Sequence, residues 1–139
     1  MLTMEEMSKG RTLAEAMGMT AELGCAVARL AGAELEAGRL EAAEAILEGL
    51  AIANPRDPVA WALLAQVARR QGKIWAAYLC AEAARRLAPE DVPVRLVRAE
   101  ALLGIPEEAA RGRQELSALA GAPGAAGDRA RALLQALGA

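Results

Sequence analysis

The sequence contains no histidine and no phenylalanine, and aromatic residues make up only 2% of it. Without histidine the chain lacks the commonest general base and the commonest metal ligand, and neither a Ser-His nor a Cys-His couple can form. The two cysteines, Cys25 and Cys80, are far apart and match no zinc-binding spacing. We therefore expect no catalytic residue, no metal and no cofactor. Both cysteines are interpreted as small apolar residues of helices, with a disulfide as the alternative.

An excess of one charge sign and a long apolar run are also missing. The formal net charge is −2, whereas a surface that binds nucleic acid needs clustered lysine and arginine. No apolar run approaches the roughly 20 residues that a membrane-spanning helix needs. Residues 1–10 lack the basic start and the apolar stretch of a secretory signal. We expect a cytoplasmic protein with no nucleic acid partner and no membrane span.

Small apolar residues are abundant instead. Hydrophobic residues make up 55% of the chain, and alanine, the best helix former, is prominent among them. The β-branched and aromatic residues that strands favour are scarce. Because small side chains bury little area each, helices must pack at close range to gain enough apolar contact. The composition predicts an all-α fold of stacked helix hairpins.

A 34-residue repeat organises the middle of the chain. Four pairs of residues lie 34 positions apart: Leu30 and Leu64, Gly38 and Gly72, Ala43 and Ala77, and Pro55 and Pro89. The glycines suit a left-handed turn after a first helix, and the prolines suit the end of a second helix. Alanine at the third pair lets two helices cross closely. Asp57 and Pro58 are typical of a helix cap and a first helical turn.

A third unit follows in a shifted register. Gly104 lies 32 residues after Gly72, which predicts a two-residue deletion, placed near residues 90–93. We expect an N-terminal helix over 5–17, then helix pairs at 20–37 with 40–53, 58–71 with 74–88, and 92–103 with 106–119. Residues 121–127 have linker composition, and Asp128 is predicted to cap a last helix that ends at Leu137. The predicted organisation is an N-terminal arm (1–19), three repeats (20–55, 56–89 and 90–120), and a linker with a capping helix (121–139).

These anchors resemble the tetratricopeptide repeat (TPR), a 34-residue helix hairpin. Repeat two carries the family pattern as Trp61, Leu64-Ala65, Gly72, Ala77 and Pro89. Repeat one has Val27 in place of the tryptophan but keeps the other anchors. The resemblance covers about residues 20–120. It implies a right-handed superhelix of about three hairpins, with an N-terminal helix and a C-terminal capping helix.

A narrower resemblance concerns the class II chaperones of type III secretion systems, which are cytosolic three-repeat proteins that hold translocator subunits before export. The layout of an N-terminal helix, three repeats and a closing helix is similar to theirs. Residues 10–15 resemble the segment before their first repeat, which contributes to dimers in that family. The resemblance therefore implies a homodimer through the N-terminal helix. This chain departs from the family in having one tyrosine and no phenylalanine.

The TPR resemblance also implies a binding site, because the first helices of successive repeats line a concave groove in that family. Carried over by register, the partner-binding residues are Cys25, Ala28, Gly32 and Leu35 in repeat one, Val59, Ala62, Gln66, Arg69 and Arg70 in repeat two, and Val94 and Arg98 in repeat three. Small residues leave room for a partner's side chains, and arginine can bind carboxylates or carbonyls. Arg69 and Arg70 are equally well explained as last-turn cations that stabilise their own helix.

Three aromatic residues complete the interpretation. Trp61 is interpreted as a core residue, whereas Trp75 and Tyr78 are left open between the core and an exposed contact with a partner. We expect a non-catalytic adaptor or chaperone that holds a protein or peptide partner. The alternative is a structural subunit that is assembled permanently in a larger complex.

Overall fold

The computed structural model describes residues 3–5, 18 and 20–138. Helices account for nearly all of the region from residue 20 onward, and they are α3 (Ala21–Glu36), α4 (Leu40–Ala53), α5 (Pro58–Arg70), α6 (Ile74–Leu87), α7 (Val92–Leu103), the 3-10 helix η1 (Pro106–Glu108), α8 (Ala109–Leu119) and α9 (Gly124–Ala136). No strand occurs in these ranges. Apart from Glu5, the predicted N-terminal helix and its dimer contact fall on residues that are not described.

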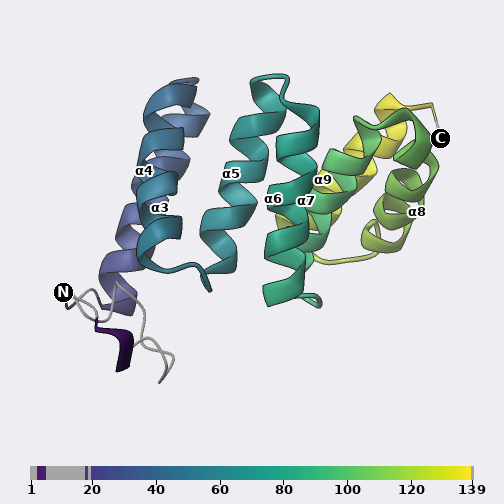
Figure 1. The fold of residues 1–139 in the computed structure, drawn as a ribbon. Coiled ribbons are helices and arrows are strands. Elements are labelled where there is room, and N and C mark those ends of the chain that lie inside the picture. The colour runs from purple at the N-terminus through teal and green to yellow at the C-terminus, as the bar shows by residue number, and fades with distance from the viewer. Residues whose placement is uncertain (1–2, 6–17, 19, 139) are drawn as a thin grey trace.

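The helices form antiparallel hairpins that stack into a helical-repeat superhelix, which confirms the predicted fold class. Figure 1 shows α3 and α4 at one end of the stack and α8 and α9 at the other. The first helices of the hairpins lie beside one another, because α5 contacts both α3 and α7. The last helix, α9, packs on α8 and also reaches α7. No helix within the described ranges is both long and apolar enough to span a bilayer.

Local chemistry at the hairpin ends explains why the helices begin and end there. The Thr20 hydroxyl caps α3 by accepting from the Leu23 amide at 3.1 Å, and the Asp57 carboxylate caps α5 by accepting from the Val59 amide at 2.9 Å. The first helices of the first two hairpins end at Gly38 and Gly72, whose φ angles of 80° and 78° only glycine adopts without strain. These helices agree with the predicted ranges to within one residue at each end.

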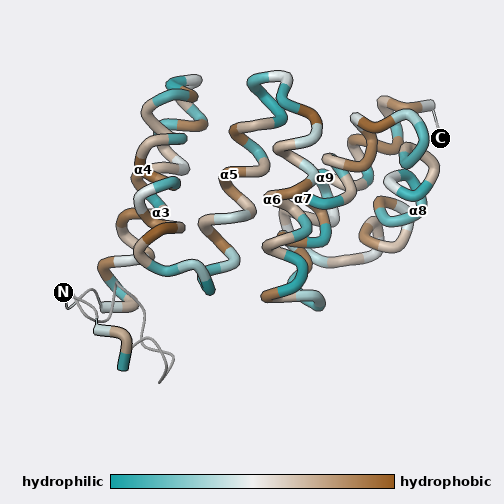
Figure 2. Tube along the Cα trace, viewed as in Figure 1, coloured by the Kyte–Doolittle hydropathy of each residue, from teal (hydrophilic) through white to brown (hydrophobic). Residues whose placement is uncertain are grey.

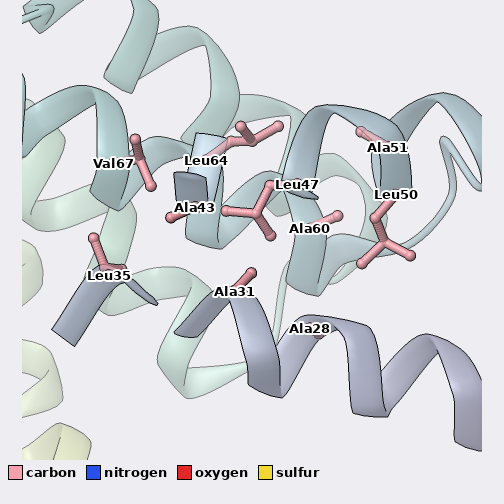
Figure 3. Close-up of a cluster of buried hydrophobic side chains, with 10 residues drawn as sticks. All are labelled: Ala28, Ala31, Leu35, Ala43, Leu47, Leu50, Ala51, Ala60, Leu64 and Val67. Atoms are coloured by element: carbon pink, nitrogen blue, oxygen red, sulfur yellow. The ribbon is translucent and has the colours of Figure 1, made fainter. Parts of the chain in front are cut away.

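Small side chains fill the core between the hairpins. Ala31, Ala43 and Ala60 are fully buried and come from α3, α4 and α5 respectively. Figure 3 shows these alanines pointing toward a few leucines, such as Leu47, in the space that the three helices enclose. Figure 2 shows that hydrophobic and hydrophilic residues alternate along the turns of each helix, as expected for helices with one buried face. Alanine at these positions lets the helix backbones approach closely and pack without aromatic residues.

The third hairpin is real, but its register shift differs from the predicted one. The turns before α5 and before α7 have equal length, and in each the aspartate amide donates to a carbonyl three residues back at 3.2 Å. The 34-residue register therefore continues from Asp57 to Asp91, and no deletion lies near residues 90–93.

The shift occurs at the turn inside the third hairpin, and it is an insertion of one residue. The buried positions of the second helices are Ala43, Leu47 and Leu50 in α4, Ala77, Ala81 and Ala84 in α6, and Gly112, Leu116 and Leu119 in α8. The offset is 34 residues from α4 to α6 and 35 from α6 to α8. The φ angle of Gly104 is −75°, in the right-handed helical region, whereas that of Gly72 is 78°. Gly104 is therefore not the structural equivalent of Gly72. The extra residue is accommodated by the 3-10 turn of η1.

The last helix also begins earlier than predicted. It starts at Gly124, with Pro123 extended before it, and Asp128 lies inside it and pairs with Arg131. Two of the glycines that indicated a linker have structural reasons instead, since Gly124 has a φ of 80° and Gly127 lies in a close contact. A Cβ on Gly127 would lie 1.8 Å from the carbonyl oxygen of Ala122, so only glycine lets α9 pass this close to the preceding turn.

The close crossing of α7 and α8 predicts a strong effect of one methyl group. A Cβ on Gly112 would lie 2.9 Å from the Ala99 carbonyl oxygen and 3.1 Å from the Leu103 amide nitrogen. We expect Gly112→Ala to lower the free energy of unfolding by about 1–3 kcal/mol, because backbone has to move. The control is Gly49→Ala in α4, where nothing lies within 4 Å of the new methyl. It should raise stability by up to about 1 kcal/mol. Equal effects of the two changes in urea unfolding would contradict this packing.

Candidate functional site

A cavity of about 730 Å³ lies on the side of the stack where the first helices of the hairpins meet. Its walls come from α3, α5, α7 and α9: Glu36, Gln66, Arg69, Arg70, Pro93, Leu96, Val97, Glu100, Ala125, Ala126 and Arg129. The lining combines apolar residues of α7 and α9 with charged residues of all four helices. We refer to this cavity as the groove.

Three of the predicted partner-binding residues line the groove, namely Gln66, Arg69 and Arg70. Arg69 is exposed and has no ion pair or hydrogen bond with any residue that the structure describes. Arg70 donates from Nη1 to the carbonyl oxygen of Leu35, at 2.6 Å, which satisfies the C-terminal end of α3. The two arginines therefore differ: Arg70 ties two repeats together, whereas the guanidinium of Arg69 is available to a ligand.

The other predicted residues of the first two repeats lie elsewhere. Cys25 and Val59 are exposed and Gly32 is half-buried, and none of the three lines the groove. Ala28, Leu35 and Ala62 are core residues with exposed fractions of 7%, 2% and 8%. Their side chains face neighbouring helices, so a partner could not contact them without displacing packed atoms.

Neither residue predicted for the third repeat lines the groove. Val94 is only 3% exposed and packs in the core. Arg98 points away from the groove, where Glu82 of α6 accepts from its Nε and Glu115 of α8 lies 3.8 Å from its Nη1. The cause is the misplaced register shift. Adding 34 to Val59, Ala62 and Gln66 gives residues 93, 96 and 100, and all three line the groove.

Glu36, Glu100 and Arg129 are charged residues of the groove that the sequence did not predict, and Glu100 is the most buried of the three. It is 8% exposed, and its Oε1 accepts from Nε and Nη2 of Arg129 at 3.0 and 2.8 Å. Removing a carboxylate from water is unfavourable unless it is paired and hydrogen-bonded. Arg129 comes from α9, at the start of the helix that was predicted to follow the linker, so only the fold brings it to Glu100.

A second charge network holds the third hairpin to the second. Glu82 accepts hydrogen bonds from Arg98 and from Arg85 Nε, the latter at 3.1 Å, and Arg95 lies 3.3 Å from Glu115. Burial by itself raises the pKa of the Glu82 carboxyl, but the hydrogen bonds from Arg98 and Arg85 outweigh it, so the pKa is lowered overall. Arg98 therefore contributes to stability at the junction of α6, α7 and α8.

The aromatic residues divide between core and surface. Trp61 is half-buried against two core clusters, and its Nε1 donates to the Pro55 carbonyl oxygen at 2.8 Å. Trp75 is 65% exposed on α6 and meets Tyr78 edge to face, with ring centroids 6.3 Å apart. Tyr78 is half-buried. Leu79, also 65% exposed, extends this apolar patch, which lies on a second helix and outside the groove.

The groove offers binding chemistry, and no catalytic arrangement is found in the part of the chain that the structure describes. There, no three histidine, cysteine, aspartate or glutamate residues gather as a metal site would require. Cys25 and Cys80 are free thiols. Arg69 and Glu100 present opposite charges beside the apolar side chains of Leu96 and Val97.

Comparisons with known proteins agree with this architecture. Residues 11–67 match the tetratricopeptide repeat model. The structure is similar to the type III secretion translocator chaperone SycD of Yersinia enterocolitica, with a TM-score of 0.74 and 18% identity over 90% of this chain and 97% of that chain. It is also similar to a type III secretion complex from Aeromonas hydrophila, with a TM-score of 0.77 and 19% identity over 95% and 91%. A comparison with curated proteins gave no match. The chain is TPR-like, and its fold resembles that of class II chaperones.

The lowered pKa of Glu82 predicts an acid-sensitive junction. The ion pairs of Glu82 stabilise the fold above the ordinary pKa of 4.5, and this contribution is lost as the pH falls through the lower folded-state pKa. We expect Glu82→Gln to be less stable than the wild type at pH 7, with a difference that shrinks as the pH falls below the ordinary pKa of 4.5. Urea unfolding above and below this pKa measures it, and Glu48→Gln, on an exposed position of α4, is the control. A difference that does not depend on pH would contradict the assignment.

The two thiols should differ in reactivity. Burial raises the pKa of the Cys80 thiol, so less thiolate forms there, whereas Cys25 is exposed. We expect a thiol reagent such as DTNB to modify Cys25 at least about tenfold faster than Cys80 at pH 8. The single variants Cys25→Ser and Cys80→Ser show which thiol gives the fast phase of the DTNB reaction and which gives the slow phase. Equal rates in the folded protein would show that Cys80 is not shielded.

Proposed function

We propose that the protein is a non-catalytic adaptor or chaperone that holds a segment of a partner polypeptide in the groove. The observation that carries the proposal is the combination of an unpaired Arg69 with apolar walls inside a hollow of about 730 Å³. A cavity of this size accommodates a few side chains. The arginine fork binds a carboxylate or a backbone carbonyl, while the half-buried Leu96 offers apolar contact to the neighbouring side chains.

The narrower proposal is a chaperone of a type III secretion translocator, acting in the cytoplasm. The likeness to SycD supports it, because it spans nearly the whole of both chains. The second similar structure is described as a type III secretion complex. A shared fold hosts many functions, so the assignment also depends on which polypeptide binds. Dimerisation through the N-terminal helix remains part of this proposal.

A charge reversal tests the groove. The tagged protein would be used to capture its partner from the native host as wild type, as Arg69→Glu and as Arg113→Glu. Arg113 is exposed on α8, outside the groove and with no ion pair among the described residues, so both variants have the same net charge. We expect a polypeptide that Arg113→Glu retains and Arg69→Glu loses, measured by quantitative mass spectrometry. Equal retention by both variants would contradict binding in the groove.

One observation favours the alternative of a structural subunit. Trp75 and Leu79, each 65% exposed, form an apolar patch outside the groove, and such patches mark surfaces that another protein covers. A permanent subunit should self-associate or aggregate through this patch when its partner is absent. The double variant Trp75→Ser/Leu79→Ser should prevent this association. A chaperone should elute from size exclusion as a monomer or dimer whether or not the patch is changed.

A further inference from the structure

Glu100 has an unused hydrogen-bonding capacity that faces the groove. Both donors from Arg129 go to the same oxygen, Oε1, and Oε2 accepts no hydrogen bond from the described residues. Every fully buried side-chain oxygen of the described residues has a hydrogen-bond partner, so the unpartnered Oε2 keeps some contact with solvent, and Glu100 lines the groove. An ionised carboxylate accepts about four hydrogen bonds. Glu100 is therefore a nearly buried acceptor whose free capacity is available to water or to a ligand in the groove.

Arg69 presents the opposite chemistry on the neighbouring helix. Its guanidinium has five N–H donors and no partner among the described residues. Among the charged residues that line the groove, Arg69 on α5 is an unpaired cation and Glu100 on α7 is a half-paired anion, and Glu36 of α3 adds an exposed carboxylate with no ion pair among the described residues. A ligand with a single charge leaves one of them unsatisfied, and an unsatisfied group in a partly desolvated site lowers affinity.

The spacing between these two groups follows from the repeat. Gln66 is the register equivalent of Glu100, 34 residues apart, and Arg69 lies three residues beyond Gln66. Packed helices such as α5 and α7 have axes about 8–10 Å apart, and three residues of helix add about 4.5 Å along the axis. The helix positions that carry Arg69 and Glu100 are thus about 10 Å apart, which corresponds to about three residues of an extended peptide or about six to seven of a helix.

We propose that the groove selects a partner segment with a charge pair: an acidic residue bound by Arg69 and, about three residues away in an extended chain, a lysine or arginine bound by Glu100. This inference rests on the proposed function and specifies the partner of the same groove. Arg129 occupies Oε1 with two hydrogen bonds, so the remaining hydrogen-bonding capacity of the Glu100 carboxylate is at Oε2.

A phage-displayed library of random twelve-residue peptides tests the charge pair. Selection on the wild type should enrich sequences with an acidic and a basic residue three positions apart. Glu100→Gln should abolish the preference for the basic residue and keep that for the acidic one, and Arg69→Met should do the reverse. The charge-matched control for Arg69→Met is Arg113→Met, which should change neither. A selected peptide should bind Glu100→Gln about tenfold more weakly in calorimetry.

A further variant separates recognition from a purely structural Glu100–Arg129 pair. Arg129→Met leaves the carboxylate in place and frees Oε1, so the preference for a basic residue should persist or increase. If Glu100 only anchors α9, Arg129→Met and Glu100→Gln would both reduce stability and neither would change the selected sequences, which would overturn the inference. A spacing of six or seven residues would overturn the extended conformation.

The library also distinguishes failure of this inference from failure of the proposed function. Leu96→Trp fills the groove with a large side chain and should block every peptide that binds there. Enriched peptides that Leu96→Trp blocks but that lack the charge pair would overturn the inference and leave groove binding intact. If no peptide is enriched, or if Leu96→Trp blocks none, the proposed function is contradicted.

Discussion

The closeness with which the helix backbones cross is the constraint on which the rest of the structure depends. Ala43, Ala77 and Gly112 occupy the same buried position in three successive second helices. A larger side chain at any of them would push two helices apart, and at Gly112 even one methyl group meets backbone atoms. Because the helices approach this closely, alanine and a few leucines suffice for the core, and a chain with only 2% aromatic residues can fold.

The same close stacking creates the groove. First helices of different hairpins must lie side by side, so residues 34 positions apart, such as Gln66 and Glu100, line one cavity. The charge that the groove offers to a ligand then depends on which charged side chains have no partner on another helix. Arg70 bridges to the end of α3 and Arg98 is held by Glu82, and both therefore belong to the scaffold. Arg69 lacks such a bridge, and this difference between adjacent arginines is visible only once the hairpins are packed.

Features governed by local chemistry could be predicted from the sequence, and features governed by register could not. The turns at Gly38 and Gly72 and the cap at Asp57 each depend on a few adjacent residues, so the first two hairpins were predicted to within one residue. The third hairpin departs from the predicted register because Gly104 occurs near the expected turn without adopting the left-handed conformation. The same difference affects the site, where Val94 and Arg98 lie outside the groove that is lined by residues 93, 96 and 100. Continuing the 34-residue count through Asp91 would have found them.

The contribution of α9 could not be predicted from local sequence, because the helix has two roles that exist only in the folded chain. A stack of hairpins leaves an apolar face at its end, and α9 covers it with Ala130 against Ala99 and Leu116. Glu100 is a carboxylate in a nearly buried position, and the same helix supplies Arg129 to it. Since α9 begins four residues before the predicted cap, Ala125 and Ala126 also reach the groove. The helix that closes the stack therefore also determines the charge and the width of the binding site.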